Sequence, residues 1–246
     1  MKNLRLASLA LAFAAGFTGQ LHAATAPPPD GVYVVGAIQR LHLSEPSFSF
    51  DHLRRIIEAV RPEVLVLEVR PDELAERKET QGRPEYPAVV WPYLAAHPTT
   101  ALPMEPGGKA FEAMTGEAGR RFAAFETEKP EADAYMTRLG RALSTVLQDH
   151  WRHPADAHDA ATLDLVRAQG LAQAQLGGPE FETGQAAWDG YMVDRTREAI
   201  VAHPGKRILV LASYRNLEAF REGLKGERRL VDMEPWLRTV LPAGVP

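Results

Sequence analysis

The chain has 246 residues, of which 45% are hydrophobic and 24% charged, with a formal net charge of −4 and no cysteine. This is the balance of an ordinary globular protein, and it excludes a disulfide framework and a lipoprotein anchor. A mildly acidic chain has no electrostatic footprint for nucleic acid or an anionic membrane, so we expect neither as a partner.

Residues 1–23 have the pattern of a secretory signal peptide. Lys2 and Arg5 precede an apolar run over 6–17, and small residues follow up to Ala23. The run is too short to span a bilayer comfortably, and an N-terminal core helix is the alternative. Cleavage after Ala23 would leave a disordered leader over 24–30 and, by removing two cations and no acid, would take the net charge from −4 to −6. We expect a periplasmic or secreted bacterial protein, which also suits a chain without cysteine.

The chain then begins with a strand–helix–strand unit. The segment "GVYVVGAI" (31–38) predicts a buried strand, and "EVLVLEV" (63–69) predicts a second. Between them, "FDHLRRIIEAV" (50–60) spaces its apolar residues as a helix does. Such a unit predicts two parallel strands with a helical crossover.

The next stretch is less regular. Residues 70–87 are polar and rich in proline, which indicates a loop that can hold one helical turn. "AVVWPYLAAH" (88–97) predicts a helix in spite of Pro92, and "TTALPME" (99–105) predicts a third, shorter strand.

Residues 109–184 carry no strand signal and are rich in alanine, glutamate and arginine. They predict an inserted group of helices, broken near Pro130, near Pro154 and over 176–184. A long amphipathic helix over 185–203 then leads back to the sheet.

The last part of the chain resumes the alternation of strands and helices. It predicts a buried strand over 206–213, a helix over 215–224, a short strand over 228–233 and a helix over 234–241. The sequence therefore predicts one α/β domain over 31–246, with a mostly parallel sheet flanked by helices and an α-helical insertion between the third and fourth core strands.

Ligands of parallel α/β sheets bind outside the carboxyl ends of the strands, and this rule selects the candidate site. The polar residues that follow the predicted strands, in chain order, are Gln39, His42, Glu68, Arg70, Glu105, Ser213, Tyr214, Arg215, Asp232 and Glu234.

Glu68 is the most informative of these residues, because it directly follows the apolar run "VLVL". A buried carboxylate is costly unless it is paired or hydrogen-bonded. It is either a structural ion-pair partner of Arg70 or Arg195, or a functional group, namely a metal ligand, a general base or a substrate clamp.

The histidines give weaker evidence of a functional site than Glu68 does. His42 is either a base or metal ligand, or a surface loop histidine. The segment "DHWRHPADAHD" (149–159) is dense in histidine and aspartate, but its spacing matches no closed zinc site. We expect a solvated helix end there, and we predict neither a metal site nor a cofactor.

Several familiar catalytic motifs are absent from the chain. It contains no G-x-S-x-G, no G-x-G-x-x-G and no H-E-x-x-H, and "PGGKAF" is an incomplete P-loop. Ser213 lies between a strand and a helix as a nucleophile-elbow serine would. It lacks flanking glycines, and no histidine follows His203 to complete a hydrolase triad.

Four short stretches suggest a family: "GAIQ" (36–39), "LVLEVRP" (65–71), "GYMVDRTREAI" (190–200) and "VLASYRNLEAF" (210–220). In this order they resemble the superfamily that joins TraB and Tiki proteins, ChaN-like haem-uptake proteins and erythromycin esterases. The resemblance implies a first strand ending in G-x-x-H, a second ending in glutamate, a helical insertion, a long helix with arginine or asparagine, and a strand ending in a second G-x-x-H.

This chain departs from that pattern at both histidines, which fall on Gln39 and Arg215. Glutamine is a poor base, and arginine is a permanent cation that does not bind metals. Glu68 and Arg195 are retained, and His42 lies close enough in sequence to substitute for the first histidine.

Two functions follow from these residues. The first is a ligand-binding protein or pseudoenzyme, whose small-molecule or peptide ligand places an anionic group at Arg195 and Arg215. The alternative is an active hydrolase that uses Glu68 and His42, with the two arginines stabilising an anionic transition state. Both predict that Glu68, Arg195 and Arg215 share a cleft roofed by 109–184, with the pKa of Glu68 lowered by the cations.

Overall fold

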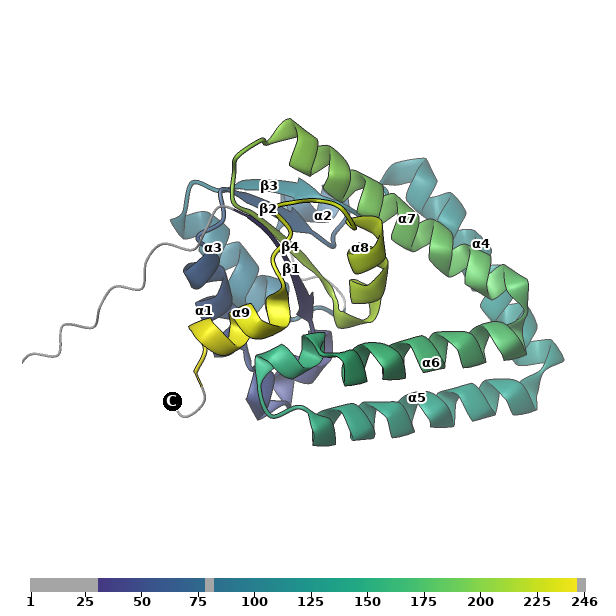
Figure 1. The fold of residues 1–246 in the computed structure, drawn as a ribbon. Helices are drawn as coiled ribbons and strands as arrows, with labels where there is room; N and C mark the ends of the chain where they lie inside the picture. Colours follow the sequence, from purple (N-terminus) through teal and green to yellow (C-terminus); the bar gives the residue numbers. More distant parts are fainter. Residues whose placement is uncertain (1–30, 78–81, 243–246) are drawn as a thin grey trace, which may run out of the picture.

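A computed structural model describes residues 31–77 and 82–242 of the chain (Figure 1). The predicted signal peptide and leader lie outside the described residues. Of the helices in the described ranges, none combines the length and the apolar character needed to cross a bilayer.

The core is a four-stranded, all-parallel sheet, as the sequence predicts (Figure 1). Its strands are β1 (Val32–Ala37), β2 (Val64–Leu67), β3 (Thr100–Pro103) and β4 (Ile208–Ser213), in the spatial order β1-β4-β2-β3. Every residue of β1, β2 and β4 is buried. Their continuous apolar runs are typical of parallel strands that are covered on both faces.

The predicted fifth strand, residues 228–233, is wrong. This segment forms one isolated parallel bridge, between Leu230 and Val32. Two backbone hydrogen bonds attach the segment to the outer edge of β1. The Val32 N–H donates to the Arg229 carbonyl, and the Val32 carbonyl accepts from the Val231 N–H. The segment cannot continue as a strand because α9 (Met233–Val240) begins at once, with Asp232 as its N-cap.

The helices of the first half follow the predicted pattern. They are α1 (Phe50–Val60), α2 (Pro71–Glu76) and α3 (Trp91–Ala96), with short turns η1 (Gln39–Leu43) and η2 (Pro46–Phe48) after β1. A π-helical turn, η3 (Tyr86–Val90), leads directly into α3. Pro92 therefore lies at the junction of the π-helical turn and α3, where the helix continues in spite of the missing N–H.

The insertion consists of helices α4 (Gly108–Glu128), α5 (Pro130–His150), η4 (Pro154–His158) and α6 (Ala160–Gly177), and α7 (Pro179–Ala202) returns to the sheet. The predicted breaks at Pro130 and Pro154 are confirmed. The third break is shorter than predicted, because Gly178 turns the chain with a φ of 97° and Pro179 starts α7 at once.

The insertion projects from the sheet as two helical pairs (Figure 1). One pair is α4 with α7, and the other is α5 with α6; the pairs meet at the end remote from the sheet, where short turns connect them. After β4, η5 (Tyr214–Asn216) and α8 (Leu217–Gly223) face the space between the pairs, whereas α9 packs on α1 and β1.

Candidate functional site

The site starts where β1 ends. At Gly36 an added Cβ would lie 2.6 Å from Leu217 Cδ1 and 2.9 Å from Tyr214 Cα, so only glycine lets η5 pack this closely on the strand. Gln39 follows with a φ of 54°, a left-handed conformation that is uncommon for residues other than glycine. Such backbone strain is often found at functional sites.

Glu68 is the buried carboxylate that the sequence predicts, with 5% of its surface exposed. Its Oε1 accepts a hydrogen bond from Arg83 Nη2 at 3.1 Å, and its Oε2 accepts one from the backbone N–H of Ser213. Arg83 also donates to the Glu68 carbonyl and to the carboxylate of Glu105, which is 4% exposed. One guanidinium thus joins the ends of β2 and β3.

Neither of the arginines that we expected beside Glu68 pairs with it. Arg70 forms ion pairs with Asp72 and Glu73 at the start of α2. Arg83 takes the place beside Glu68, and it also reaches Glu105 at the end of β3.

A further carboxylate lies beside Arg83. Glu85 is 1% exposed, and its Oε2 has no hydrogen-bond partner among the described residues, nor does the buried hydroxyl of Tyr86. We call Glu68, Arg83, Glu85 and Glu105 the Arg83 cluster. Because it holds three carboxyl groups and one cation, full ionisation would leave an excess of negative charge away from water.

The charge state of the cluster follows from its burial. Burial raises the pKa of Glu68 to about 7, although Arg83 and the Ser213 N–H act in the opposite direction. Burial likewise raises the pKa of Glu85 to about 7. The predicted lowering of the Glu68 pKa is therefore wrong, because the loss of hydration outweighs the attraction of the cation.

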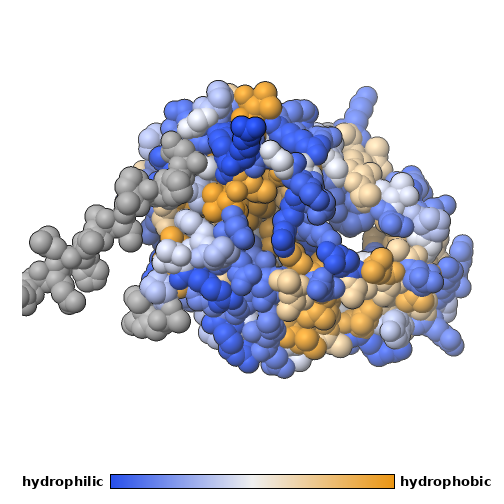
Figure 2. All heavy atoms as spheres, in the orientation of Figure 1, coloured by the Kyte–Doolittle hydropathy of each residue, from blue (hydrophilic) through white to orange (hydrophobic). Residues whose placement is uncertain are grey.

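A cavity of about 1040 Å³ opens beside the cluster, between α4, α6, α7 and α8. Figure 2 shows it as a hollow in the surface between α6 and α7. Its floor is formed at the carboxyl ends of β1, β2 and β4 by Gln39, Glu68, Ser213, Arg215 and Asn216. The helical insertion therefore roofs a cleft at the predicted edge of the sheet.

Asp189 brings a second carboxylate to the floor, from α7. Its Oδ1 accepts hydrogen bonds from Asn216 Nδ2 at 2.7 Å and from Gln185 Nε2 at 2.9 Å. Burial raises the pKa of Asp189. Two carboxyl groups whose pKa values are raised thus border the same cavity, an arrangement that favours a functional site.

His42 does not reach the cavity. Its Nδ1 donates to the Phe48 carbonyl at 2.6 Å, and its Nε2 accepts from the Ile38 N–H at 3.1 Å. Burial lowers the pKa of His42 to about 4. The ring is therefore neutral, and both nitrogens are used to close the turn after β1.

Arg195 and Tyr214 also lie apart from the cavity lining. Arg195 is on the exposed side of α7, where it pairs with Glu198 and lies over the Tyr191 ring. Tyr214 is buried, with its ring packed edge-on against Trp151. The predicted convergence thus holds for Glu68 and Arg215 and fails for Arg195, because its position on α7 turns it away from the sheet.

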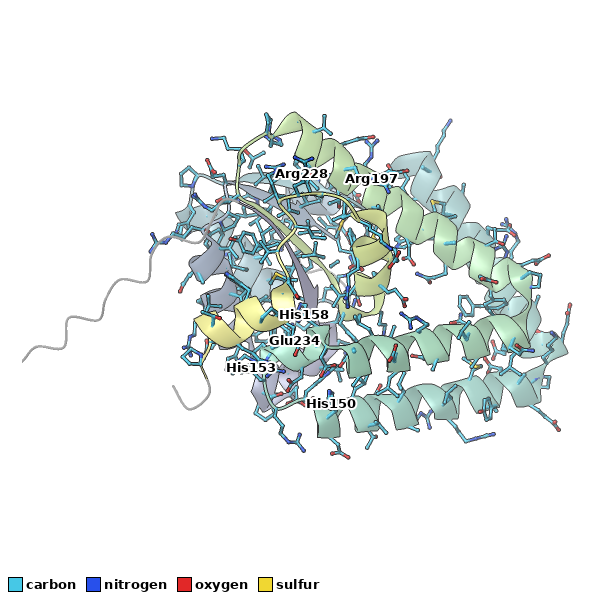
Figure 3. The ribbon with its side chains drawn as sticks, viewed as in Figure 1. His150, His153, His158, Arg197, Arg228 and Glu234 are labelled. Carbon is cyan, nitrogen blue, oxygen red and sulfur yellow. The ribbon has the colours of Figure 1, made fainter. Side chains whose placement is uncertain are left out.

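The histidine-rich segment is buried over 154–158, whereas Asp149 and Arg152 are exposed, so the expected solvated helix end holds only for its first part. His158 is enclosed: its Nε2 accepts from the Gly36 N–H at 3.0 Å, and its Nδ1 donates to the Pro154 carbonyl. Burial lowers the pKa of His158 to about 4. Figure 3 shows His150, His153 and His158 where η4 passes beside α9, and His150 bonds Asp159. Within the described ranges, no three potential ligands group as a metal site would require.

Sequence reasoning missed Arg83, Asp189 and Asn216. Asn216 follows β4 and would have been found by extending the strand-end rule by one residue. Asp189 lies four residues from the predicted start of a helix, and Arg83 lies in a loop without periodicity. No local pattern indicates that either side chain reaches the sheet edge.

Comparison with known proteins gave no matching family model, no curated relative and no similar solved structure. The resemblance to the TraB, ChaN-like and erythromycin-esterase superfamily therefore stays a prediction.

Proposed function

We propose that this protein binds a small organic molecule with an anionic group in the cavity at the carboxyl edge of its sheet. The observation that carries the proposal is a cavity of about 1040 Å³ with Arg215 on its floor. Its size is at the upper end of the range of about 300–1,000 Å³ that is typical of small-molecule sites.

Arg215 is the group suited to the anion. Its guanidinium is exposed, and Nη1 donates to Gln169 Oε1 at 3.1 Å across the floor. It makes no ion pair with a carboxylate of the described chain, whereas the other two lining arginines, Arg121 and Arg167, each pair with a glutamate. A guanidinium with N–H groups facing a cavity suits a carboxylate.

Binding without turnover is favoured by the residues at the two positions where the resemblance implies histidine. Gln39 and Arg215 both line the cavity, and neither is a base at neutral pH. This supports a binding site at the position where the family's site is expected, without the two histidines that catalysis would use.

A second candidate is an enzyme in which Glu68 transfers a proton. A carboxyl group with a pKa of about 7 on a cavity floor is suited to general acid–base work. It would act without His42, whose ring nitrogens are both engaged. Ester hydrolysis that is present in the wild type and lost in Glu68→Gln would favour this candidate over binding alone.

The binding proposal is tested with anilinonaphthalene sulfonate, an apolar fluorescent anion. We expect saturable binding at one site, weakened about tenfold or more by Arg215→Gln, because a charge-assisted hydrogen bond contributes roughly 1.5–3 kcal/mol. Ala187→Trp, which fills the cavity from α7, should also weaken binding. Arg54→Gln, an exposed arginine on α1, is the matched control. Binding that neither cavity substitution changes would overturn the proposal.

We also propose export, on the pattern of residues 1–23. The intact mass of protein expressed in a bacterial host with its full sequence should correspond to a chain that starts at Ala24. A periplasmic or secreted form that retains Met1 would contradict export by a cleaved signal.

A further inference from the structure

We infer that the ligand of this cavity is an amphiphile, with one carboxylate head at the sheet edge and an aliphatic body between the two helical pairs. The inference rests on the proposed function and names its ligand class.

The cavity is elongated along the helices. It is lined by residues 113–122 of α4, 166–174 of α6 and 180–189 of α7. Nine residues of α-helix rise about 14 Å, so the cavity extends roughly this far from the sheet edge. A space of this shape fits a chain better than a compact molecule.

The cavity offers both polar and apolar surface to a ligand. The floor at the sheet edge is polar, with Gln39, Glu68, Ser213, Arg215 and Asn216. The walls farther out mix large apolar side chains with charged ones. Phe122 is 52% exposed and Leu171 64% exposed, among Glu117, Arg121, Glu180 and Glu182.

The outer apolar wall is ordered by ring contacts. Phe122 packs edge-on against Phe181 at 5.0 Å, and Phe125 supports the same ring. Apolar side chains exposed on a concave wall, next to a polar floor, indicate a surface that a ligand covers.

The charges around the cavity select a single negative head rather than a polyanion. Six carboxylic acids line it and only three arginines: Glu68, Glu117, Glu180, Glu182, Asp189 and Glu218, against Arg121, Arg167 and Arg215. Two of these arginines are already paired with glutamate. A nucleotide or a polyphosphate would meet net repulsion, whereas one carboxylate can pair with Arg215.

Competition with bound anilinonaphthalene sulfonate tests the inference. Decanoate should displace the dye, and octanoate should do so roughly tenfold or more less effectively, because each buried methylene changes affinity about fourfold. Decanol and acetate, which each lack one half of the amphiphile, should be far weaker competitors.

Matched variants test which residues bind the aliphatic body of the ligand and which bind its carboxylate. Phe122→Ser and Leu171→Ser, at exposed positions that folding does not need buried, should weaken decanoate at least fivefold. Val146→Ser, an exposed apolar position on α5 outside the cavity lining, should leave it unchanged. Arg215→Gln should abolish the preference for decanoate over decanol.

The outcomes separate this inference from the proposed function. If compact anions displace the dye and chain length has no effect, the cavity binds an anion but the amphiphile is wrong. Displacement by an acidic peptide and not by decanoate would likewise overturn it. If neither Arg215→Gln nor Ala187→Trp changes the affinity for the dye, the proposed function is wrong as well.

Discussion

Replacement of Arg83 by methionine is expected to lower the free energy of unfolding at pH 8 by about 3–5 kcal/mol, the usual cost of removing one partner from a buried ion pair. Arg83 is the cation shared by Glu68 and Glu105, and its side chain is only 18% exposed. Without it, both carboxylates must either stay ionised without a partner or take up protons.

Urea unfolding followed by tryptophan fluorescence measures the effect. Adding Glu68→Gln and Glu105→Gln to Arg83→Met should recover more than half of the loss, because the amides need no counter-ion. Arg54→Met, which breaks an exposed pair with Asp51, should cost less than about 1 kcal/mol. A loss of that small size for Arg83→Met would show that the cluster is not held by this arginine.

The fold was predictable where the pattern is long. The valine- and leucine-rich runs of β1, β2 and β4 are typical of strands in a sheet covered on both faces, and the prolines at 130 and 154 mark helix starts inside the insertion. The error at 228–233 came from a short apolar run. Its local pattern suits a strand, but α9 begins at Met233, inside the predicted range.

The candidate site was predictable where chain direction alone decides. Gln39, Glu68 and Arg215 follow parallel strands, so all three reach the same edge and line one cavity. The predicted position of Arg195 was wrong, because which side of a helix faces the sheet depends on packing that the sequence does not show. The predicted direction of the Glu68 pKa shift was wrong for a related reason. A sequence shows which charges are present, but it does not show how much hydration each loses on burial.

Glu68 connects the Arg83 cluster to the cavity, because it belongs to the cluster and lines the floor. The affinity for a ligand in the cavity can therefore depend on whether Glu68 is ionised. Glu85 interacts with Arg83 and does not line the cavity. Its ionisation therefore measures the cost of negative charge in the cluster without a contribution from a ligand.

Glu85→Gln is accordingly expected to stabilise the protein at pH 8 by roughly 3 kcal/mol and at pH 5 by less than about 1 kcal/mol. Burial raises the pKa of Glu85 from its ordinary value of 4.5 to about 7. Between these two pH values the folded state keeps a proton that the unfolded state has released. The stability of the wild type therefore falls as pH rises through this window, and the amide, which cannot ionise, escapes the loss.

The comparison must be made as a difference between variant and wild type at each pH. His42 and His158 act in the opposite direction, because burial lowers the pKa of each to about 4, so that acid favours the unfolded state. Their effect cancels in the difference. Glu222→Gln, on the exposed surface beside Lys225, should change stability by less than about 0.5 kcal/mol at both pH values. Equal effects of Glu85→Gln at pH 5 and pH 8 would mean that Glu85 does not titrate in this window, and the charge balance argued for the cluster would be wrong.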